Sequence, residues 1–137
     1  MPNRTLTKRE IEARSAFRHQ LRRFERFGED AARSQGVTFP QYLLLLHVKG
    51  TPGREWALVG ELAQKMILEH HSVVGLVSRC EAAGLVKRRR SIEDARQVEV
   101  HLTPKGERAL NAIAVAQSGE LKALAAYLKA AALKPAR

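Results

Sequence analysis

Apolar residues recur at helical spacing along most of the chain, whereas residues 85–102 alternate between apolar and polar positions in the manner of β-strands. The two ends of the chain predict long helices over residues 7–36 and 104–133. A Thr-x-x-Glu capping box at Thr7 begins the first helix, and Thr103 followed by proline begins the second. Each helix carries one apolar stripe that needs a partner surface, and we therefore expect the two helices to form the interface of a homodimer.

Glycines mark the irregularities expected in these terminal helices. Gly36 is a good C-terminal stop for the first helix. Gly28 lies inside the first apolar stripe, where it can bend or weaken the helix. Gly119 is expected to kink or split the C-terminal helix.

The middle of the chain predicts three shorter helices. The first runs from Thr38, which begins a second capping box, to Gly50, and it is apolar on nearly all sides, as a core helix is. The second is expected over residues 57–66, with Trp56 packed beneath it. The third is expected over residues 69–83, and its apolar positions follow the i, i+3, i+4, i+7 spacing of one buried face: Val73, Leu76, Val77 and Cys80.

Residues 85–90 and 97–102 predict two strands joined by a polar tip. Two helices joined by a short turn and followed by such a hairpin make a winged helix-turn-helix, which we assign to residues 38–103. The expected fold class is therefore mainly α with a small β wing. The winged helix-turn-helix lies between N- and C-terminal dimerisation helices, within a single domain over residues 1–137.

In a winged helix-turn-helix the second helix enters the major groove of DNA with its N-terminal residues near the base edges. Hydroxyl and imidazole groups there can hydrogen-bond bases or phosphates, valine can touch a thymine methyl, and glycine permits close approach. The residues expected on this exposed face are His70, His71, Ser72, Val74 and Gly75. Arg79, one turn further on, is better placed for a phosphate contact.

The predicted wing supplies further basic groups. The run at residues 87–90 lies on a strand, so at most half of its side chains can face one DNA backbone, and we expect Arg88 and Arg90 to supply that charge. Arg96 at the tip can enter the narrow minor groove. Asp94 can pair with Arg96 and fix its direction. A salt bridge that only stabilises the turn is the alternative role of this pair, and both roles can hold together.

Three segments of the chain resemble the MarR family of bacterial transcription regulators: SVVGLVSRCEAAGLVKRR from residue 72, Asp-Ala-Arg at residues 94–96, and Val-His-Leu-Thr-Pro-Lys-Gly at residues 100–106. The resemblance covers the chain in element order, and its specific motifs lie within residues 61–106. It implies an obligate dimer with interleaved terminal helices that binds a pseudo-palindromic operator. It also implies base-reading positions for Ser72, Val74 and Gly75 and a minor-groove position for Arg96.

The chain departs from the family pattern at a few positions. Leu58 stands where many members have a Ser or Thr helix cap, and Cys80 occupies a position that is usually leucine. Val74 and Gly75 replace commoner polar residues. We therefore expect sparse direct base readout, with the histidines carrying more of it.

The resemblance also implies a small-molecule effector. Many members of the family bind small aromatic acids or phenols in a cleft between the dimer helices and the winged region. Such a cleft would be lined by residues that more often simply pack in a protein core, so an effector-binding role and a core-packing role both stay open for the candidates. The candidates here are Arg14, Phe17, His19, Leu21, His47 and Trp56.

Composition favours a polyanionic partner. Twenty-four Lys and Arg against 14 Asp and Glu give a formal net charge of +10, which points to nucleic acid first and an anionic membrane surface second. The N-terminal residues lack the apolar core of a signal peptide, and no run approaches the roughly 20 apolar residues of a membrane span. We expect a cytoplasmic protein without membrane contact. The single cysteine excludes an internal disulfide.

The sequence gives little support to other chemistries. It contains no nucleophile–base pair, glycine-rich phosphate loop or carboxylate pair that would indicate an enzyme, and we expect no cofactor. His70 and His71 are adjacent in a helix and point about 100° apart, so they do not share a metal-ligand face. Cys80 is better explained as a buried core residue than as a redox sensor. Two hypotheses remain: a homodimeric repressor relieved by a small ligand, and a winged-helix module for protein or RNA contacts.

Overall fold

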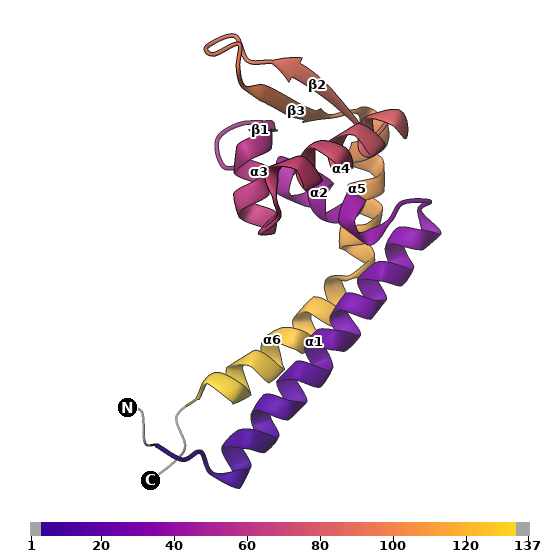
Figure 1. The fold of residues 1–137 in the computed structure, drawn as a ribbon. Coiled ribbons are helices and arrows are strands. Elements are labelled where there is room, and N and C mark those ends of the chain that lie inside the picture. Colours follow the sequence, from indigo (N-terminus) through magenta and orange to yellow (C-terminus); the bar gives the residue numbers. More distant parts are fainter. Residues whose placement is uncertain (1–3, 134–137) are drawn as a thin grey trace.

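The computed structural model describes residues 4–133 and shows a head joined to a long arm of two helices (Figure 1). The arm consists of α1, Lys8–Ser34, and α6, Ser118–Ala132, which lie side by side although they come from opposite ends of the chain. The side-chain amide of Gln20 donates to Glu120 Oε2 at 3.1 Å across this pair. The ends of the single domain expected over residues 1–137, namely 1–3 and 134–137, lie outside the described residues.

The predicted caps of the first two helices are confirmed. Thr7 and Glu10 form the reciprocal capping box at the start of α1, with hydrogen bonds of 3.1 and 2.9 Å between each side chain and the other residue's backbone N–H. Thr38 and Gln41 do the same for α2, Phe39–Lys49. Gly36 ends the first helix with φ at +75°, a conformation that costs glycine little.

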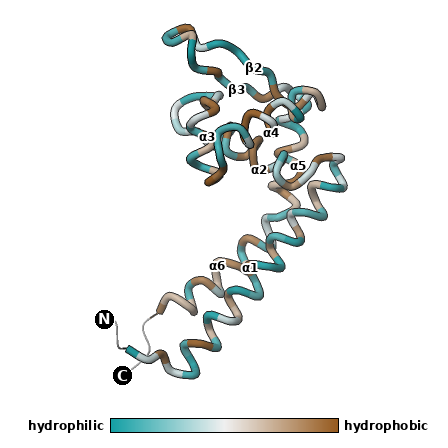
Figure 2. Tube along the Cα trace, in the orientation of Figure 1, coloured by the Kyte–Doolittle hydropathy of each residue, from teal (hydrophilic) through white to brown (hydrophobic). Residues whose placement is uncertain are grey.

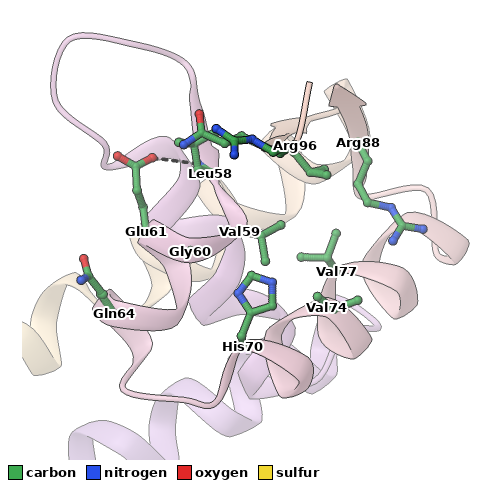
Figure 3. Close-up of a pocket in the computed structure, with 12 residues that line it drawn as sticks. Leu58, Val59, Gly60, Glu61, Gln64, His70, Val74, Val77, Arg88 and Arg96 are labelled. Atoms are coloured by element: carbon green, nitrogen blue, oxygen red, sulfur yellow. Dashed lines mark hydrogen bonds between the residues drawn. The ribbon is translucent and has the colours of Figure 1, made fainter. Parts of the chain in front are cut away.

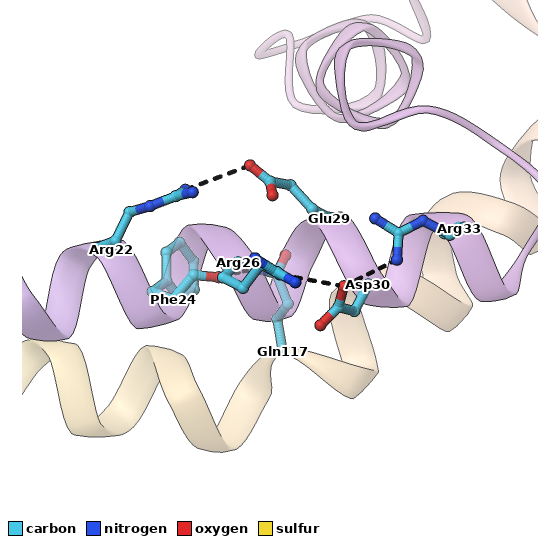
Figure 4. A network of polar contacts seen from close by, with 7 residues as sticks. All are labelled: Arg22, Phe24, Arg26, Glu29, Asp30, Arg33 and Gln117. Carbon is cyan, nitrogen blue, oxygen red and sulfur yellow. Dashed lines mark hydrogen bonds and ion pairs between the residues drawn. The ribbon is translucent and has the colours of Figure 1, made fainter.

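The C-terminal helix is split, as expected, but the break lies at Gln117 rather than at Gly119. It separates α5, Pro104–Ala116, from α6. The Gln117 side chain is buried and donates its Nε2 to the backbone carbonyl of Phe24 in α1 at 3.1 Å (Figure 4). Gly28 faces the same amide across the helix pair, and α1 continues through it without interruption. The expected weakening of α1 is therefore not seen, and the absence of a side chain at Gly28 leaves room for Gln117 and for Phe39 of α2.

The head contains a strand that the sequence pattern did not predict. The helix expected over residues 57–66 begins later, as α3, Val59–Met66, because Trp56–Leu58 form β1. This strand joins β2, Val86–Arg90, and β3, Val98–Leu102, in an antiparallel sheet of order β1-β3-β2. Trp56 lies opposite His101 in the sheet and has the Arg54 guanidinium 4.2 Å from its ring centroid.

The core of the head lies between α2, α4 (His70–Ala82), α5 and the sheet, and the most apolar segments gather there (Figure 2). All four apolar positions predicted for α4 are buried: Val73, Leu76, Val77 and Cys80. Leu44, Leu45 and Val48 of α2 are fully buried beside them, which confirms α2 as a core helix. Within residues 4–133, no helix combines the length and the apolar character needed to cross a lipid bilayer.

Candidate nucleic-acid interface

The helix-turn-helix consists of α3 and α4, joined by a turn of three residues that begins at Ile67. Ile67 adopts a left-handed conformation, with φ at 55° and ψ at 51°, and its N–H donates to the carbonyl of Gln64. The left-handed conformation is sterically unfavourable for a β-branched residue. Because the Ile67 side chain is 89% exposed, its burial offsets little of this strain. The tight turn fixes the crossing of the two helices.

The missing cap at the start of α3 is replaced by an acidic residue. Leu58 stands at the N-cap without a side-chain hydrogen bond, and Glu61 Oε1 accepts the backbone N–H of Leu58 at 2.8 Å. Glu61 also pairs with Arg54, which stacks on Trp56. Partial burial opposes ionisation of this carboxyl, but the hydrogen bond from Leu58 and the pairing with Arg54 hold the pKa of Glu61 below its usual value.

The face of α4 that was predicted to read bases points away from the core. Val74 is 38% exposed, and Gly75 is partly covered by the neighbouring Arg79 side chain. The other predicted members of this face are all exposed: His70, His71, Ser72 and Arg79.

A groove of about 470 Å³ lies between α3, α4 and the wing, which we define as residues 86–102 (Figure 3). His70 and Val74 line it from the recognition helix α4, and Arg88 and Arg96 line it from the wing. Four of the ten predicted DNA-binding residues thus meet around one groove. The others lie outside its lining: His71, Ser72, Gly75, Arg79, Arg90 and Asp94.

The predicted pairing of Asp94 with Arg96 is present at the wing tip. Arg96 donates to the Asp94 carboxylate from its backbone N–H at 3.0 Å and from Nε and Nη2 at 3.1 Å each. The Arg96 side chain is 91% exposed, so the pair holds a cation out in solvent rather than burying it. Hydrogen bonds from the side chain and the backbone of Arg96 hold the pKa of Asp94 below its usual value.

The wing tip is anchored beneath this pair. Ser91 is buried, its N–H donates to the carbonyl of Gln97 at 2.9 Å, and its Oγ accepts the N–H of Asp94 at 3.3 Å. The N–H of Gln97 donates to the Asp94 carbonyl at 2.9 Å. The sequence reasoning did not single out Ser91, although a serine three residues before an Asp-x-Arg turn is a local signal of this geometry.

The basic run on β2 divides between the two faces of the sheet, as the strand periodicity predicts. Arg88 lies on the face of α4, where its guanidinium pairs with Glu81. Arg90 is exposed and forms no ion pair with any residue between 4 and 133. Lys87 and Arg89 alternate with these two and stand opposite His101 and Glu99 of β3.

Comparison with known proteins agrees with this geometry. A model of the MarR family matches residues 35–97, and a transcriptional regulator named TtmR from Methylorubrum extorquens is 39% identical over 70 residues, which are 51% of this chain and 34% of that protein. A MarR family protein from Bacillus stearothermophilus superimposes with a TM-score of 0.74 at 26% identity, covering 88% of this chain and 82% of the other. The structure of reduced AbfR bound to DNA superimposes with a TM-score of 0.61 at 28% identity, covering 84% of this chain and 84% of the other.

Through residues 35–97 the chain is similar to the MarR family. Its winged helix-turn-helix and its mainly helical fold are those of the family's solved structures. The chain spans about a third to a half of the length of the first curated relatives it matches.

The MarR-like Leu-Thr-x-x-Gly segment, residues 102–106, has a structural explanation in this chain. Thr103 caps α5 by accepting the N–H of Gly106 at 3.1 Å, and its own hydroxyl donates to the carbonyl of Gly84 at 2.6 Å. Lys105 Nζ donates to the carbonyl of Ala83 at 2.8 Å, a contact that the sequence did not indicate. The motif therefore binds the C-terminal end of the recognition helix to the start of α5.

The six residues considered for a MarR-type effector site do not converge within one chain. His19 lines a pocket of about 360 Å³ along α1 beside Glu120 of α6, whereas His47 lines a separate pocket of about 230 Å³ near Lys65. Burial and the nearby Lys65 charge lower the pKa of His47. The remaining four candidates line neither of these two pockets: Arg14, Phe17, Leu21 and Trp56.

Cys80 is fully buried on the core side of α4, and burial raises the pKa of its thiol to about 11. A thiol in this environment is almost entirely protonated at neutral pH and is a poor nucleophile. Among residues 4–133, no three His, Cys, Asp or Glu side chains gather in a way that could hold a metal ion.

Proposed function

We propose that this protein is a transcription regulator that binds a specific double-stranded DNA site as a homodimer. The observation that carries the proposal is the arrangement of two different reading elements across one groove. The exposed N-terminal face of α4 lies on one side, and Arg96, held outward by Asp94, lies on the other. A helix for the major groove and an arginine for the adjacent minor groove are the two parts that a winged helix-turn-helix uses.

Every predicted residue except Arg88, which pairs with Glu81, has a direct role in this proposal that fits its exposure. His70, His71 and Ser72 offer polar groups to base edges, while Val74 and Gly75 supply apolar contact and close approach. Arg79 and Arg90 contact phosphates, since both are exposed and basic. Arg96 enters the minor groove, with Asp94 fixing its direction. The net charge of +10 supplies the long-range attraction.

The arm is the surface that favours a second copy of the chain. Apolar side chains along α1, α5 and α6 are exposed in the single chain. Contact of so many apolar side chains with water is unfavourable, and such a surface is typical of a protein–protein interface. Covering them with the same surface of a second copy gives a symmetric dimer that presents two recognition helices to two half-sites. These exposed residues are Ile11, Phe27, Val115, Leu121, Tyr127, Leu128 and Leu133.

We further propose that the dimer represses nearby genes in the cytoplasm and that a small aromatic or phenolic ligand relieves this repression. The support is that relatives in sequence are regulators: one is named an organic hydroperoxide resistance transcriptional regulator and another a putative transcriptional regulatory protein for the hcr operon. In this proposal His19 of the arm and His47 of the head, which line separate pockets in one chain, contribute to a cleft that the dimer partner completes.

A binding experiment tests the DNA-binding proposal. Duplexes are selected from a random-sequence pool with the wild-type protein, and the affinity for the enriched duplex is compared with that for a scrambled duplex of the same composition over a range of salt concentrations. We expect tight, salt-dependent binding of the enriched duplex and at least tenfold weaker binding by Arg96→Ala. Arg33→Ala removes the same charge from α1 and serves as the control, with near wild-type affinity expected.

Equal affinity for the enriched and scrambled duplexes at physiological salt would remove the regulator proposal. That outcome would favour a winged-helix module that binds protein or RNA. Sedimentation of the wild-type protein and of Leu121→Glu tests the dimer separately, because a charge on the exposed arm should convert the dimer to a monomer. A wild-type monomer at micromolar concentration would contradict the dimer.

A further inference from the structure

A single carboxylate at the end of the recognition helix binds the first strand of the wing at three points. Glu81, in the last turn of α4, accepts the backbone N–H of Arg88 through Oε2 at 3.1 Å. Its Oε1 accepts hydrogen bonds from Nε and Nη2 of Arg88 at 3.0 and 2.8 Å. The remaining nitrogen, Nη1, donates to Ser78 Oγ at 3.2 Å. All three guanidinium nitrogens of Arg88 are therefore engaged within the protein.

The backbone contact matters because β2 is an outer strand. Among residues 4–133 it pairs only with β3, so the N–H of Arg88 that reaches Glu81 points away from the sheet. An outer strand with open N–H groups is free to twist or slide, and a partner on that edge restrains it. Glu81 thus covers the free edge of the wing with a group that belongs to the recognition helix.

The two reading elements must keep a fixed spacing to meet one DNA duplex. His70 and Val74 lie on α4, whereas Arg96 lies in the tip of the wing, between β2 and β3. A small change in the angle between α4 and β2 is magnified along the hairpin before it reaches Arg96. A cation without an ion-pair partner is better suited than Arg88 to contact phosphate, and Arg90, on the same face of β2, has no such partner among residues 4–133.

We propose that Glu81 and Arg88 form a strut that sets the angle between the recognition helix and the wing, so that Arg88 is a positioning residue for DNA binding rather than a phosphate contact. The strut rests on the DNA binding proposed above. It assigns a role in DNA binding to Glu81, an acidic residue that electrostatics alone would rank as unfavourable beside a polyanion. The proposal is testable because the strut predicts weaker DNA binding when Glu81 is removed, whereas electrostatics alone predicts tighter binding.

The test measures affinity for the enriched duplex with Glu81→Ala, Arg88→Met and the double variant. A strut predicts that each single variant binds about three- to tenfold more weakly and that the double variant is no weaker than either single one, because both lose the same contact. It also predicts an unchanged slope of log affinity against log salt for Arg88→Met. A phosphate contact predicts a slope reduced by about one and tighter binding for Glu81→Ala.

Matched controls come from the same wing. Glu93→Ala removes an exposed wing-tip carboxylate that pairs with no described residue, and it should leave affinity unchanged or raise it. Arg90→Met should weaken binding and reduce the salt slope by about one, as expected for a phosphate contact. Glu81→Gln, which keeps the shape and helix propensity of the side chain, repeats the measurement if Glu81→Ala does not fold.

A second measurement without DNA separates the strut from the proposed function. Hydrogen exchange of the Arg88 amide should be slow in the wild-type protein and at least about tenfold faster in Glu81→Ala, while the amide of Val100 in β3 stays protected. Unchanged exchange at Arg88, or tighter DNA binding by Glu81→Ala, would overturn the strut. Faster exchange with no sequence-specific binding by the wild-type protein would support the strut as a structural feature and overturn its role in DNA binding together with the proposed function.

Discussion

Gly106 in α5 lies directly against the carbonyl group of Leu85, at the point where the recognition helix passes into the wing. A Cβ atom on residue 106 would overlap the Leu85 carbonyl oxygen and would lie 3.0 Å from its carbonyl carbon. The same carbonyl oxygen accepts the N–H of Thr103 at 3.0 Å, so it cannot move away without loss of that bond. The backbone contact with Leu85 therefore requires glycine at the last position of the Leu-Thr-x-x-Gly segment.

Gly106→Ala should destabilise the protein by about 1–3 kcal/mol or more, because a backbone carbonyl cannot rearrange as a side chain can. Gly119→Ala is the matched control, since a Cβ there meets no atom within 4 Å, and it should stabilise α6 by up to about 1 kcal/mol. Denaturant unfolding followed by circular dichroism measures both. Equal effects of the two substitutions would contradict the close contact.

Ile67→Gly should stabilise the protein by about 1 kcal/mol, because glycine adopts the left-handed conformation of residue 67 without the steric cost that isoleucine pays. The side chain is 89% exposed, so little buried surface is lost. Ile92→Gly is the control: Ile92 is 99% exposed but is not among the described residues with positive φ. A gain in the unfolding midpoint for Ile92→Gly as large as that for Ile67→Gly would argue against strain at the turn.

Gly28→Ala should destabilise the protein by about 1–3 kcal/mol, although the same change in an open helix is favourable. A Cβ on residue 28 would lie 2.5 Å from Nε2 of Gln117 and 2.7 Å from Cε1 of Phe39. Gln117→Ala removes the first of these obstacles, so the double variant should lose less stability than the sum of the two single variants. Simple additivity of the unfolding free energies would show that Gly28 and the Gln117 side chain do not pack against each other.

Cys80 should resist thiol reagents in the folded protein. Burial raises the pKa of the thiol from 9.0 to about 11, so the thiolate fraction stays small until the pH approaches that value. A neutral native thiol contributes stability that is present below pH 9 and is lost as the pH rises through about 11. Reaction with a chromogenic disulfide reagent at pH 8 should be far slower in buffer than in denaturant, and fast labelling of the native protein would contradict the buried position.

Most of the helices could be predicted from the sequence because their ends are set by interactions between residues close together in the chain. Capping boxes at Thr7 and Thr38 and a left-handed glycine at residue 36 act within a few residues, and the structure has all three. The spacing of the buried residues of α4 was also readable, since one face of a helix repeats on a short period. The Asp94–Arg96 pair was predictable for the same reason, with its two members only two residues apart.

Other features depend on contacts between distant parts of the chain. The strand Trp56–Leu58 has only three residues and exists because β3, more than 40 residues away, supplies its hydrogen-bonding partner. The helix break at Gln117 follows from a hydrogen bond to Phe24 rather than from a helix-breaking residue. Arg88 looked like a DNA contact from its place in a basic run, and only the packed structure placed Glu81 against it.

By itself the sequence determined the helical elements, the winged helix-turn-helix and the presence of an exposed basic surface, because periodicity, capping and charge are properties of neighbouring residues. The tertiary structure decided which of those basic residues face solvent and which bind within the protein, and why residues 28, 106 and 117 are Gly, Gly and Gln. The physical reason is that ion pairs and close backbone approaches depend on distances between residues far apart in the chain, which no local pattern encodes.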